Sequence, residues 1–269
     1  MRAVLLTSTF RRHHYMANTL AAGCDLVGVW QEEKSFHPER YARNDVEEHV
    51  IQQHFDRRQE AEERYFPYHG AVLGSLNVRA VAAGACNDPG EIERMAALAP
   101  DVVLVFGTGM LRERILSTFK GRIINVHLGL SPYYRGSGTN FWPLVNREPE
   151  YVGATIHCLD PRLDYGSILT HARPLIERGD GPHDIGNKAI LRAAAVALPA
   201  AVSLLGGATG TLPQWTKGRL YQRKHFSADA VRRLQRHFET GMIDEYLAHA
   251  AARDTALRLI ELKGGNPGA

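Results

Sequence analysis

Short apolar runs alternate along the chain with longer segments in which apolar residues recur every three or four positions. The short runs are rich in Val, Leu and Ile and are bounded by polar or turn residues, which predicts buried strands. They lie at residues 2–6, 26–30, 77–81, 102–106 and 123–126. Strands that alternate with helices are typical of a parallel sheet that is covered on both faces. The pattern therefore predicts an α/β fold with an open, mostly parallel, Rossmann-like sheet flanked by helices.

Two of the intervening helices carry specific signals. Asp88 is a suitable N-cap, Pro89 suits the first helical position, and Glu91 is placed to complete a capping box. Residues 45–66 contain no Gly or Pro, and their apolar side chains are spaced as on one face of a helix. These apolar residues are Val46, Val50, Ile51 and Phe55. This segment is either an exposed helix that packs on the protein, or a flap or a dimer contact. In the case of a dimer contact the protein would be a homodimer.

The C-terminal third changes character at Gly206. Before it, residues 168–175 predict an antiparallel or edge strand and residues 185–205 a long helix on the sheet. After it come a Gly-rich stretch, a short extended segment near residues 213–221, and a helix from Ser227 that runs through residue 247 with Ser227 as its N-cap. We therefore expect one domain over residues 1–206 and a short C-terminal extension over residues 207–269.

Composition narrows the class of protein. The 269 residues are 44% hydrophobic, which is ample for a core. The net charge is only +3, with acidic and basic residues interspersed, which argues against a nucleic-acid partner. The longest apolar stretch, residues 193–205, is Ala-rich and contains Pro199, so a buried helix is expected and no membrane partner. The residues after Met1 are too few for a signal peptide and predict a first strand, which makes a cytoplasmic location the default.

The cysteines do not indicate a metal or a disulfide. Cys24, Cys86 and Cys158 are scattered without the spacing of a metal or redox motif. Free thiols and no metal are therefore expected.

Candidate chemistry lies at the end of the fifth predicted strand. Alternate side chains of a strand share a face, so Asn125 and His127 point the same way and can converge on one atom. An amide donor and an imidazole beside each other suit a polarised carbonyl, whose oxygen needs hydrogen-bond donors and whose reaction needs proton transfer. Asp164 would then orient the imidazole or relay the proton.

The same residues resemble a known motif. Residues 125–132, read as NVHLGLSP, and Asp164-Tyr165-Gly166 are similar to the Asn-x-His-x-Ser-Leu-Leu-Pro and Asp-x-Gly motifs of the folate-dependent formyltransferases. Residues 101–111 and 153–157 extend the resemblance, which covers about residues 75–205. Gly129, Ser131 and Tyr165 depart from the motif, but no proposed catalytic residue is lost.

The resemblance implies roles for particular residues. Asn125, His127 and Asp164 would be catalytic. The folate would lie against main-chain groups of Phe106, Gly107, Thr108, Gly109, Met110 and Leu111 and of the loop that begins at Asp160. The acceptor would be bound by Arg11, His13, Tyr133, Arg135, Asn140 and Trp142. For residues 11–14 a solvated helix start is the alternative to recognition of an anion, and for Arg135 it is a structural salt bridge; Trp142 could equally pack into the core.

The resemblance implies an enzyme that transfers a formyl group from 10-formyltetrahydrofolate to the amine of a small molecule, such as an amino sugar or an amino-acid-derived metabolite, without a metal. A 10-formyltetrahydrofolate hydrolase and a catalytically silent folate or metabolite sensor are the alternatives. Residues 7–9 end the first strand without the Gly-rich phosphate cradle of the purine-pathway members. The C-terminal extension is shorter than the nucleic-acid-binding domain of the tRNA-acting members.

Overall fold

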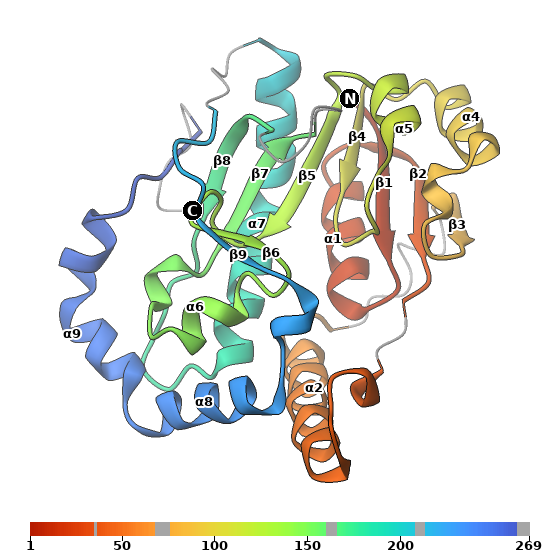
Figure 1. Cartoon of the computed structure of the whole chain (residues 1–269). Coiled ribbons are helices and arrows are strands. Elements are labelled where there is room, and N and C mark those ends of the chain that lie inside the picture. Colours follow the sequence, from red (N-terminus) through yellow and green to blue (C-terminus); the bar gives the residue numbers. More distant parts are fainter. Residues whose placement is uncertain (35–36, 68–75, 160–165, 208–212, 263–269) are drawn as a thin grey trace.

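A computed structural model of the chain describes residues 1–34, 37–67, 76–159, 166–207 and 213–262. Its centre is a seven-stranded sheet in the order β3-β2-β1-β4-β5-β7-β8. The pairs among the first five strands of that order are parallel, and β7 runs antiparallel to both β5 and β8. A separate pair joins β6 to β9 in parallel. Figure 1 shows the sheet with helices on its faces and the C-terminal helices at its β8 side. The α/β prediction is confirmed.

The elements have the following bounds. The strands are β1 Arg2–Ser8, β2 Asp25–Glu32, β3 Val78–Val81, β4 Val102–Val105, β5 Ile123–Leu128, β6 Tyr134–Gly136, β7 Ala154–Cys158, β8 Ile168–Ala172 and β9 Arg219–Tyr221. The α-helices are α1 Arg11–Ala21, α2 Asp45–Tyr65, α4 Pro89–Ala97, α5 Glu113–Thr118, α6 Phe141–Val145, α7 Pro182–Leu205, α8 Ala228–Glu239 and α9 Met242–Thr255. Single 3-10 turns lie at Pro38–Arg40, Ala85–Asn87, Pro149–Tyr151 and Arg223–His225.

Each face of the sheet builds its own core. Leu5, Leu104 and Val126 belong to the cluster shared with α1 and α7. Their sequence neighbours, such as Leu6 and Val105, belong to the cluster shared with α4 and α5. This alternation follows from the two-residue period of a strand and explains why the strands read as continuous apolar runs.

The five predicted parallel strands are all present, with small differences at their ends. β1 and β5 each continue two residues beyond the predicted end, to Ser8 and Leu128. The residues beyond the predicted ends include polar ones, Thr7 and Ser8 in β1 and His127 in β5. The apolar pattern therefore stops before the hydrogen-bonded pairing of the strand does. β8 is an antiparallel edge strand, as predicted for residues 168–175, but it ends at Ala172.

The predicted capping box at α4 is wrong. Asp88 is the N-cap residue, but its side chain makes no capping hydrogen bond. The Glu91 carboxylate turns instead to the indole N–H of Trp30 at 2.7 Å and to the guanidinium of Arg79 at 2.5 and 2.8 Å. A charge-assisted bidentate pair is stronger than a hydrogen bond to one main-chain N–H, so the tertiary partner prevails.

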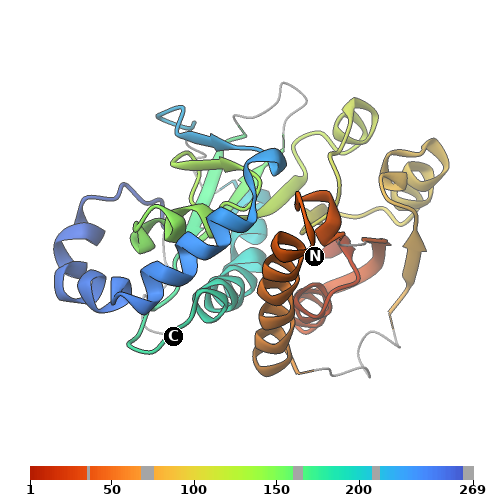
Figure 2. The ribbon, with the colours of Figure 1, turned by 60° about the horizontal axis from the view of Figure 1, so that its bottom comes forward.

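Helix α2 buries polar residues where the sequence suggested an apolar face. Val46 is 68% exposed, whereas Glu47, His54 and Glu62 are buried with Ile51. The helix begins at the side-chain cap of Asn44 and packs against α7 and α8. Figure 2 shows α2 standing beside α7 and next to the start of α8. Its inward face is polar because it borders a cavity, described below.

The C-terminal extension is two helices, where the sequence predicted one. Ser227 caps α8 through its side chain as expected. The helix ends at Glu239 with Thr240 as its C-cap, and Gly241 takes φ +79°, a left-handed conformation that glycine adopts freely, so the chain turns into α9. The extended segment becomes β9, which pairs with β6 in the loop after β5. The domain boundary at residue 206 stays a prediction.

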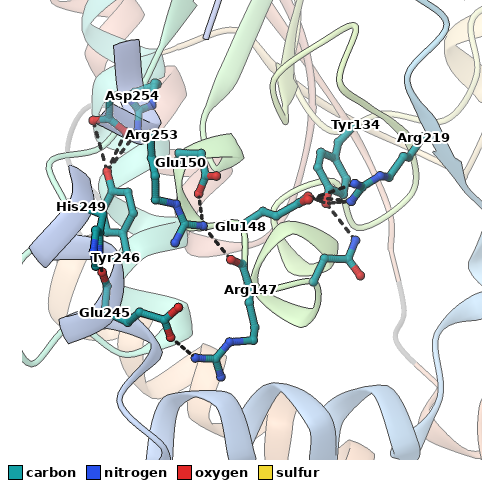
Figure 3. Close-up of polar contacts among 12 residues, drawn as sticks. Tyr134, Arg147, Glu148, Glu150, Arg219, Glu245, Tyr246, His249, Arg253 and Asp254 are labelled. Carbon is teal, nitrogen blue, oxygen red and sulfur yellow. Dashed lines mark hydrogen bonds and ion pairs between the residues drawn. The ribbon is translucent and has the colours of Figure 1, made fainter. Parts of the chain in front are cut away.

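Ion pairs attach the C-terminal extension to residues 147–150, in and next to the 3-10 turn Pro149–Tyr151 (Figure 3). Arg219 binds Glu148 through two hydrogen bonds of 2.6 and 2.9 Å, and the Tyr134 hydroxyl donates to the same carboxylate. On α9, Arg253 binds the buried Glu150 carboxylate at 2.6 Å, and Arg147 pairs with Glu245. These bidentate and partly buried ion pairs attach β9 and α9 to the residues in and next to the 3-10 turn Pro149–Tyr151.

Among the described helices, only α7 is long and apolar enough to cross a membrane by length and composition. Its buried residues, including Ile185, Ala193 and Ala201, pack against the sheet and the C-terminal core. That placement is the one expected of a core helix.

Gly218 lies where the C-terminal extension packs closely against the loop after β5. It has φ +54°, and a Cβ there would collide with the carbonyl oxygen of Pro132. We expect Gly218→Ala to destabilise the protein by roughly 1–3 kcal/mol, as overpacking does. Thermal and urea denaturation measure the effect. Gly241→Ala is the matched control, since φ is also positive there but no atom lies within 4 Å; equal losses in both variants would contradict the fit.

Candidate active site

The antiparallel pairing of β5 with β7 brings the candidate chemistry together. Asn125 lies opposite His157, and His127 lies opposite Thr155. Residues opposite each other in an antiparallel pair point to the same face. All four side chains therefore share the face of the sheet away from α7. The two residues predicted from β5 thus gain a second imidazole that the motif did not include.

Asn125 and His157 are hydrogen-bonded. The amide Nδ2 of Asn125 is 3.1 Å from Nε2 of His157. Nδ1 of His157 is 3.1 Å from the carbonyl oxygen of Cys158 and donates to it, which leaves Nε2 as an acceptor for one amide hydrogen of Asn125. The imidazole therefore orients the amide and leaves its second N–H for another acceptor.

Thr139 completes the surroundings of His127. The Thr139 hydroxyl donates to the carbonyl of Leu128 and lies 3.4 Å from Nε2 of His127. Because its single proton goes to Leu128, its oxygen accepts from His127, which assigns the proton of the neutral imidazole to Nε2. Thr139 reaches this position because Gly129 has φ +137° and no Cβ, and a Cβ there would collide with Thr139. The departure of Gly129 from the formyltransferase motif therefore has a structural reason.

Burial keeps both imidazoles neutral. Desolvation, with a smaller contribution from His157, lowers the pKa of His127 from 6.5 to about 4. Desolvation also lowers the pKa of His157, although its bond to the Cys158 carbonyl opposes the shift. A neutral Nε2–H is a hydrogen-bond donor, so at neutral pH His127 can stabilise developing negative charge without carrying a positive charge itself.

A cavity of about 640 Å³ adjoins this cluster. Thr139 and Leu128 line it next to His127, and α2, α6, α7 and α8 supply other parts of its wall. Its aromatic lining consists of Phe10, Tyr41, Phe55, Phe141, Trp142 and Phe226. The volume and mixed polarity suit a small-molecule ligand.

Two residues of the cavity wall have amide donors that are buried and unpaired. Asn187, only 3% exposed, and Asn140 both line it, and neither Nδ2 atom has a hydrogen-bond partner among the described residues. Asn140 uses its oxygen to accept from the Gly153 N–H at 3.0 Å. A buried donor without a partner is costly, so a ligand with oxygen acceptors would be stabilised here.

The residues predicted to hold the folate form the loop after β4. Phe106 is buried against the ring of His13, and Gly107 accepts a hydrogen bond from Lys34 at its carbonyl. The N–H of Gly109 donates to Glu32 at 2.7 Å. Met110 is 78% exposed and Leu111 is buried, while the Thr108 hydroxyl bonds the Gly109 carbonyl. Asp160 and the catalytic candidate Asp164 lie outside the described residues.

The predicted acceptor residues divide into two groups. Asn140 and Trp142 line the cavity, and Trp142 also stacks on Tyr221 with ring centroids 4.3 Å apart. The other four residues do not line it. Arg11 pairs with Glu63, His13 packs between Phe10 and Phe106, Tyr133 bonds the main chain of Arg258, and Arg135 bonds the Lys217 carbonyl. Their roles in acceptor binding stay predictions.

Sequence reasoning missed several residues of the site. His157 sits at the end of a strand whose antiparallel pairing is not visible in the sequence. Asn187 and Arg58 look like ordinary polar positions on helices. A signal existed for α2, where Glu47, His54 and Glu62 recur at helical spacing on the side that carries Ile51.

The comparisons with known proteins agree on one family. A family model described as formyl transferase matches residues 7–202, well over half of the chain. Among solved structures, a sugar N-formyltransferase from a Shewanella species is similar, with 15% sequence identity and a TM-score of 0.56 over 84% of this chain and 78% of that one.

Two further solved structures share the fold. A phosphoribosylglycinamide formyltransferase from Anaplasma phagocytophilum is 14% identical, with a TM-score of 0.55 over 83% of this chain and 98% of that one. A sugar 3N-formyltransferase, solved in the presence of dTDP and 5-N-formyl-THF, is 15% identical, with a TM-score of 0.54 over 84% of this chain and 71% of that one.

The depressed pKa of His127 predicts sensitivity to acid. Between pH 6.5 and 4 the unfolded chain binds this proton and the folded chain does not, so stability falls as the pH decreases through that window. The loss attributable to this residue is up to roughly 3 kcal/mol. Urea denaturation of the wild type and of His127→Gln at pH 7 and pH 4.5 measures it. The variant retains the other buried histidines and should lose less stability on acidification; equal losses would contradict the assignment.

Proposed function

The chain belongs to the formyl transferase family, and on that premise we propose that it transfers the formyl group of 10-formyltetrahydrofolate to the amine of a small molecule. An amino sugar is the acceptor class that the cavity favours. The observation that carries the proposal is the pair of neutral donors, Asn125 and His127, on one strand face; Thr139, which contacts His127, also lines the cavity.

The donors match the charge that formyl transfer develops. The acceptor nitrogen attacks the formyl carbon, and the carbonyl oxygen becomes an oxyanion in the tetrahedral intermediate. Asn125 donates its free amide hydrogen to that oxygen because His157 takes the other one. His127 donates from Nε2 by exchanging its long 3.4 Å contact with the Thr139 oxygen for the oxyanion, and its low pKa keeps it in the neutral donor form.

Protons balance without an outside acid. The attacking amine loses one proton, and N10 of the folate gains one as its bond to the formyl carbon breaks. In the proposed reaction Asp164 takes the proton of the amine and passes it to His127, and His127 delivers a proton to N10, so that both residues end in the protonation state in which they began. No nucleophilic side chain and no metal takes part in these steps.

The acceptor side of the proposal rests on the cavity. The unpaired amide donors of Asn140 and Asn187 require oxygen acceptors, and the hydroxyls of a sugar ring supply several in a small volume. The aromatic lining gives the apolar faces of such a ring a surface to contact. An amino-acid-derived amine offers fewer acceptors and is the second choice.

One assay separates this function from its alternatives. The protein is incubated with 10-formyltetrahydrofolate, with and without a panel of amino sugars and other amines, and tetrahydrofolate release is followed. Amine-dependent release supports the transferase. Tetrahydrofolate release that does not depend on an amine identifies a hydrolase. Saturable binding of 10-formyltetrahydrofolate without release identifies a sensor.

The catalytic assignment predicts a selective loss of rate. His127→Ala and Asn125→Ala should each lower kcat/KM by about a hundredfold or more, because each removes a donor to the oxyanion. Their melting temperatures should change little. Cys158→Ser is the control, since Cys158 is hydrogen-bonded to His157 through its main-chain carbonyl, which the substitution leaves in place. Near-wild-type turnover in purified His127→Ala would reject the site.

Two known acceptors of related enzymes should be poor substrates here. The hydroxyls of Thr7 and Ser8 are already bonded to the carbonyls of Phe106 and Glu32, so they do not offer a phosphate cradle. We therefore expect weak formylation of glycinamide ribonucleotide. Initiator methionyl-tRNA should also be poor, because the net charge is only +3 with acidic and basic residues interspersed. A specificity constant of about 10⁴ M⁻¹s⁻¹ or above for either acceptor would overturn this expectation.

A further inference from the structure

Helix α2 brings an unbalanced charge cluster to the wall of the cavity. Two guanidiniums share the single carboxylate of Glu62. They belong to Arg12, at the start of α1, and to Arg58, on α2. Arg12 is in hydrogen-bond contact with Oε1 of Glu62, and Nε of Arg58 is 3.7 Å from the same oxygen. All three residues line the cavity. One carboxylate cannot neutralise two guanidiniums, so a positive charge remains.

Two further cations face the same space. Lys34 and Arg223 line the cavity, which makes four cationic side chains against the three carboxylates Glu32, Glu33 and Glu62. Glu32 offsets part of this positive charge, and its Oε2 also accepts the N–H of Gly109.

Burial and mutual repulsion lower the pKa values of two cations in the cluster. Burial and the charge of Arg12 lower the pKa of Arg58 to about 10. Burial, together with the charges of Arg12 and Arg223, lowers the pKa of Lys34 even though Glu32 opposes the shift. Cations held together out of water in this way are stabilised by an added anion.

Aromatic rings hold the two guanidiniums in place. The Arg12 guanidinium lies over the ring of Phe10 at 4.7 Å, and that of Arg58 lies over Phe55 at 4.4 Å. Stacking fixes a guanidinium by its face and leaves its N–H edge for hydrogen bonds. The Arg58 side chain is 32% exposed and that of Arg12 is 14% exposed, whereas Glu62 is only 6% exposed. The cations, more than the carboxylate, are therefore accessible.

We propose that Arg12 and Arg58 form an anion-binding subsite that selects acceptors carrying a phosphate or carboxylate group, with Lys34 and Arg223 adding long-range attraction. The inference rests on the proposed function, because the cavity is taken as the acceptor site. It makes α2 a specificity-determining helix: α2 supplies Arg58 and the carboxylate that holds both guanidiniums when no ligand is bound.

Binding of simple anions tests the subsite without any formyl donor. Inorganic pyrophosphate, inorganic phosphate and malonate are titrated into the full chain by calorimetry at low salt, and thermal shifts are recorded in parallel. Arg58→Met should weaken pyrophosphate binding by about tenfold or more, since a charge-assisted contact is lost. Arg57→Met is the matched control, because Arg57 is exposed on the same helix and does not line the cavity. It should change the Kd by less than about twofold.

Two other variants separate binding from a purely structural role. Arg58→Lys keeps the charge and should restore part of the affinity. Glu62→Gln removes the competing carboxylate and should tighten anion binding, even if it destabilises the unliganded protein. A structural ion pair predicts that Glu62→Gln and Arg58→Met change affinity in the same direction, and that result would overturn the proposal.

The remaining outcomes are equally decisive. Tighter binding of pyrophosphate or phosphate than of malonate identifies a phosphorylated acceptor, and the reverse order identifies a carboxylated one. No saturable binding of any of the three at about 10 mM would reject the subsite, because two oriented guanidiniums should reach that affinity. If tetrahydrofolate release still depends on an amine in that case, the proposed function survives. If anions bind and no amine supports release, the proposed function fails by itself.

Discussion

The antiparallel pairing of β5 with β7 is the constraint on which the candidate site depends. It places Asn125 opposite His157, so that a hydrogen bond to the imidazole fixes the orientation of the Asn125 carboxamide. It also leaves His127 on the same face, next to Thr139. A parallel neighbour would have given a different set of facing residues, since the register of cross-strand pairs follows from strand direction. The reversal of direction at β7 therefore sets the geometry of the candidate site.

Desolvation is the second physical theme. His127, His54 and His183 have pKa values lowered to about 4, about 3 and about 4, chiefly by burial. His54 and His183 lie against each other in the cavity wall, with ring centroids 4.6 Å apart. Neutral imidazoles pack with aromatic rings and donate one hydrogen bond each without adding positive charge. The excess charge of the cavity is thereby confined to the arginine and lysine side chains.

The two segments outside the parallel sheet meet at the cavity. Helix α2 is inserted between β2 and β3, and the C-terminal extension contributes Arg223, Phe226 and Leu234 to the wall. The extension is held there by the pairing of β9 with β6 and by the Arg219 contacts with Glu148. Strand β5 supplies the two candidate donors Asn125 and His127, while these added elements line the cavity that we propose for the acceptor. Acceptor choice can in that way differ among enzymes that share the same sheet.

Sequence patterns are enough to predict the parallel strands, the helix starts at Pro89 and Ala228, and the placement of Asn125 and His127 on one strand face. These features depend on short-range periodicity and local capping, which a single segment carries. Tertiary structure alone decided that His157 faces Asn125, that Glu91 leaves the cap of α4 for Trp30 and Arg79, and that α2 turns its polar side inward. Those outcomes depend on which distant groups come within reach after folding, and the free energy of a buried charge or amide depends on its partners and not on its neighbours in sequence.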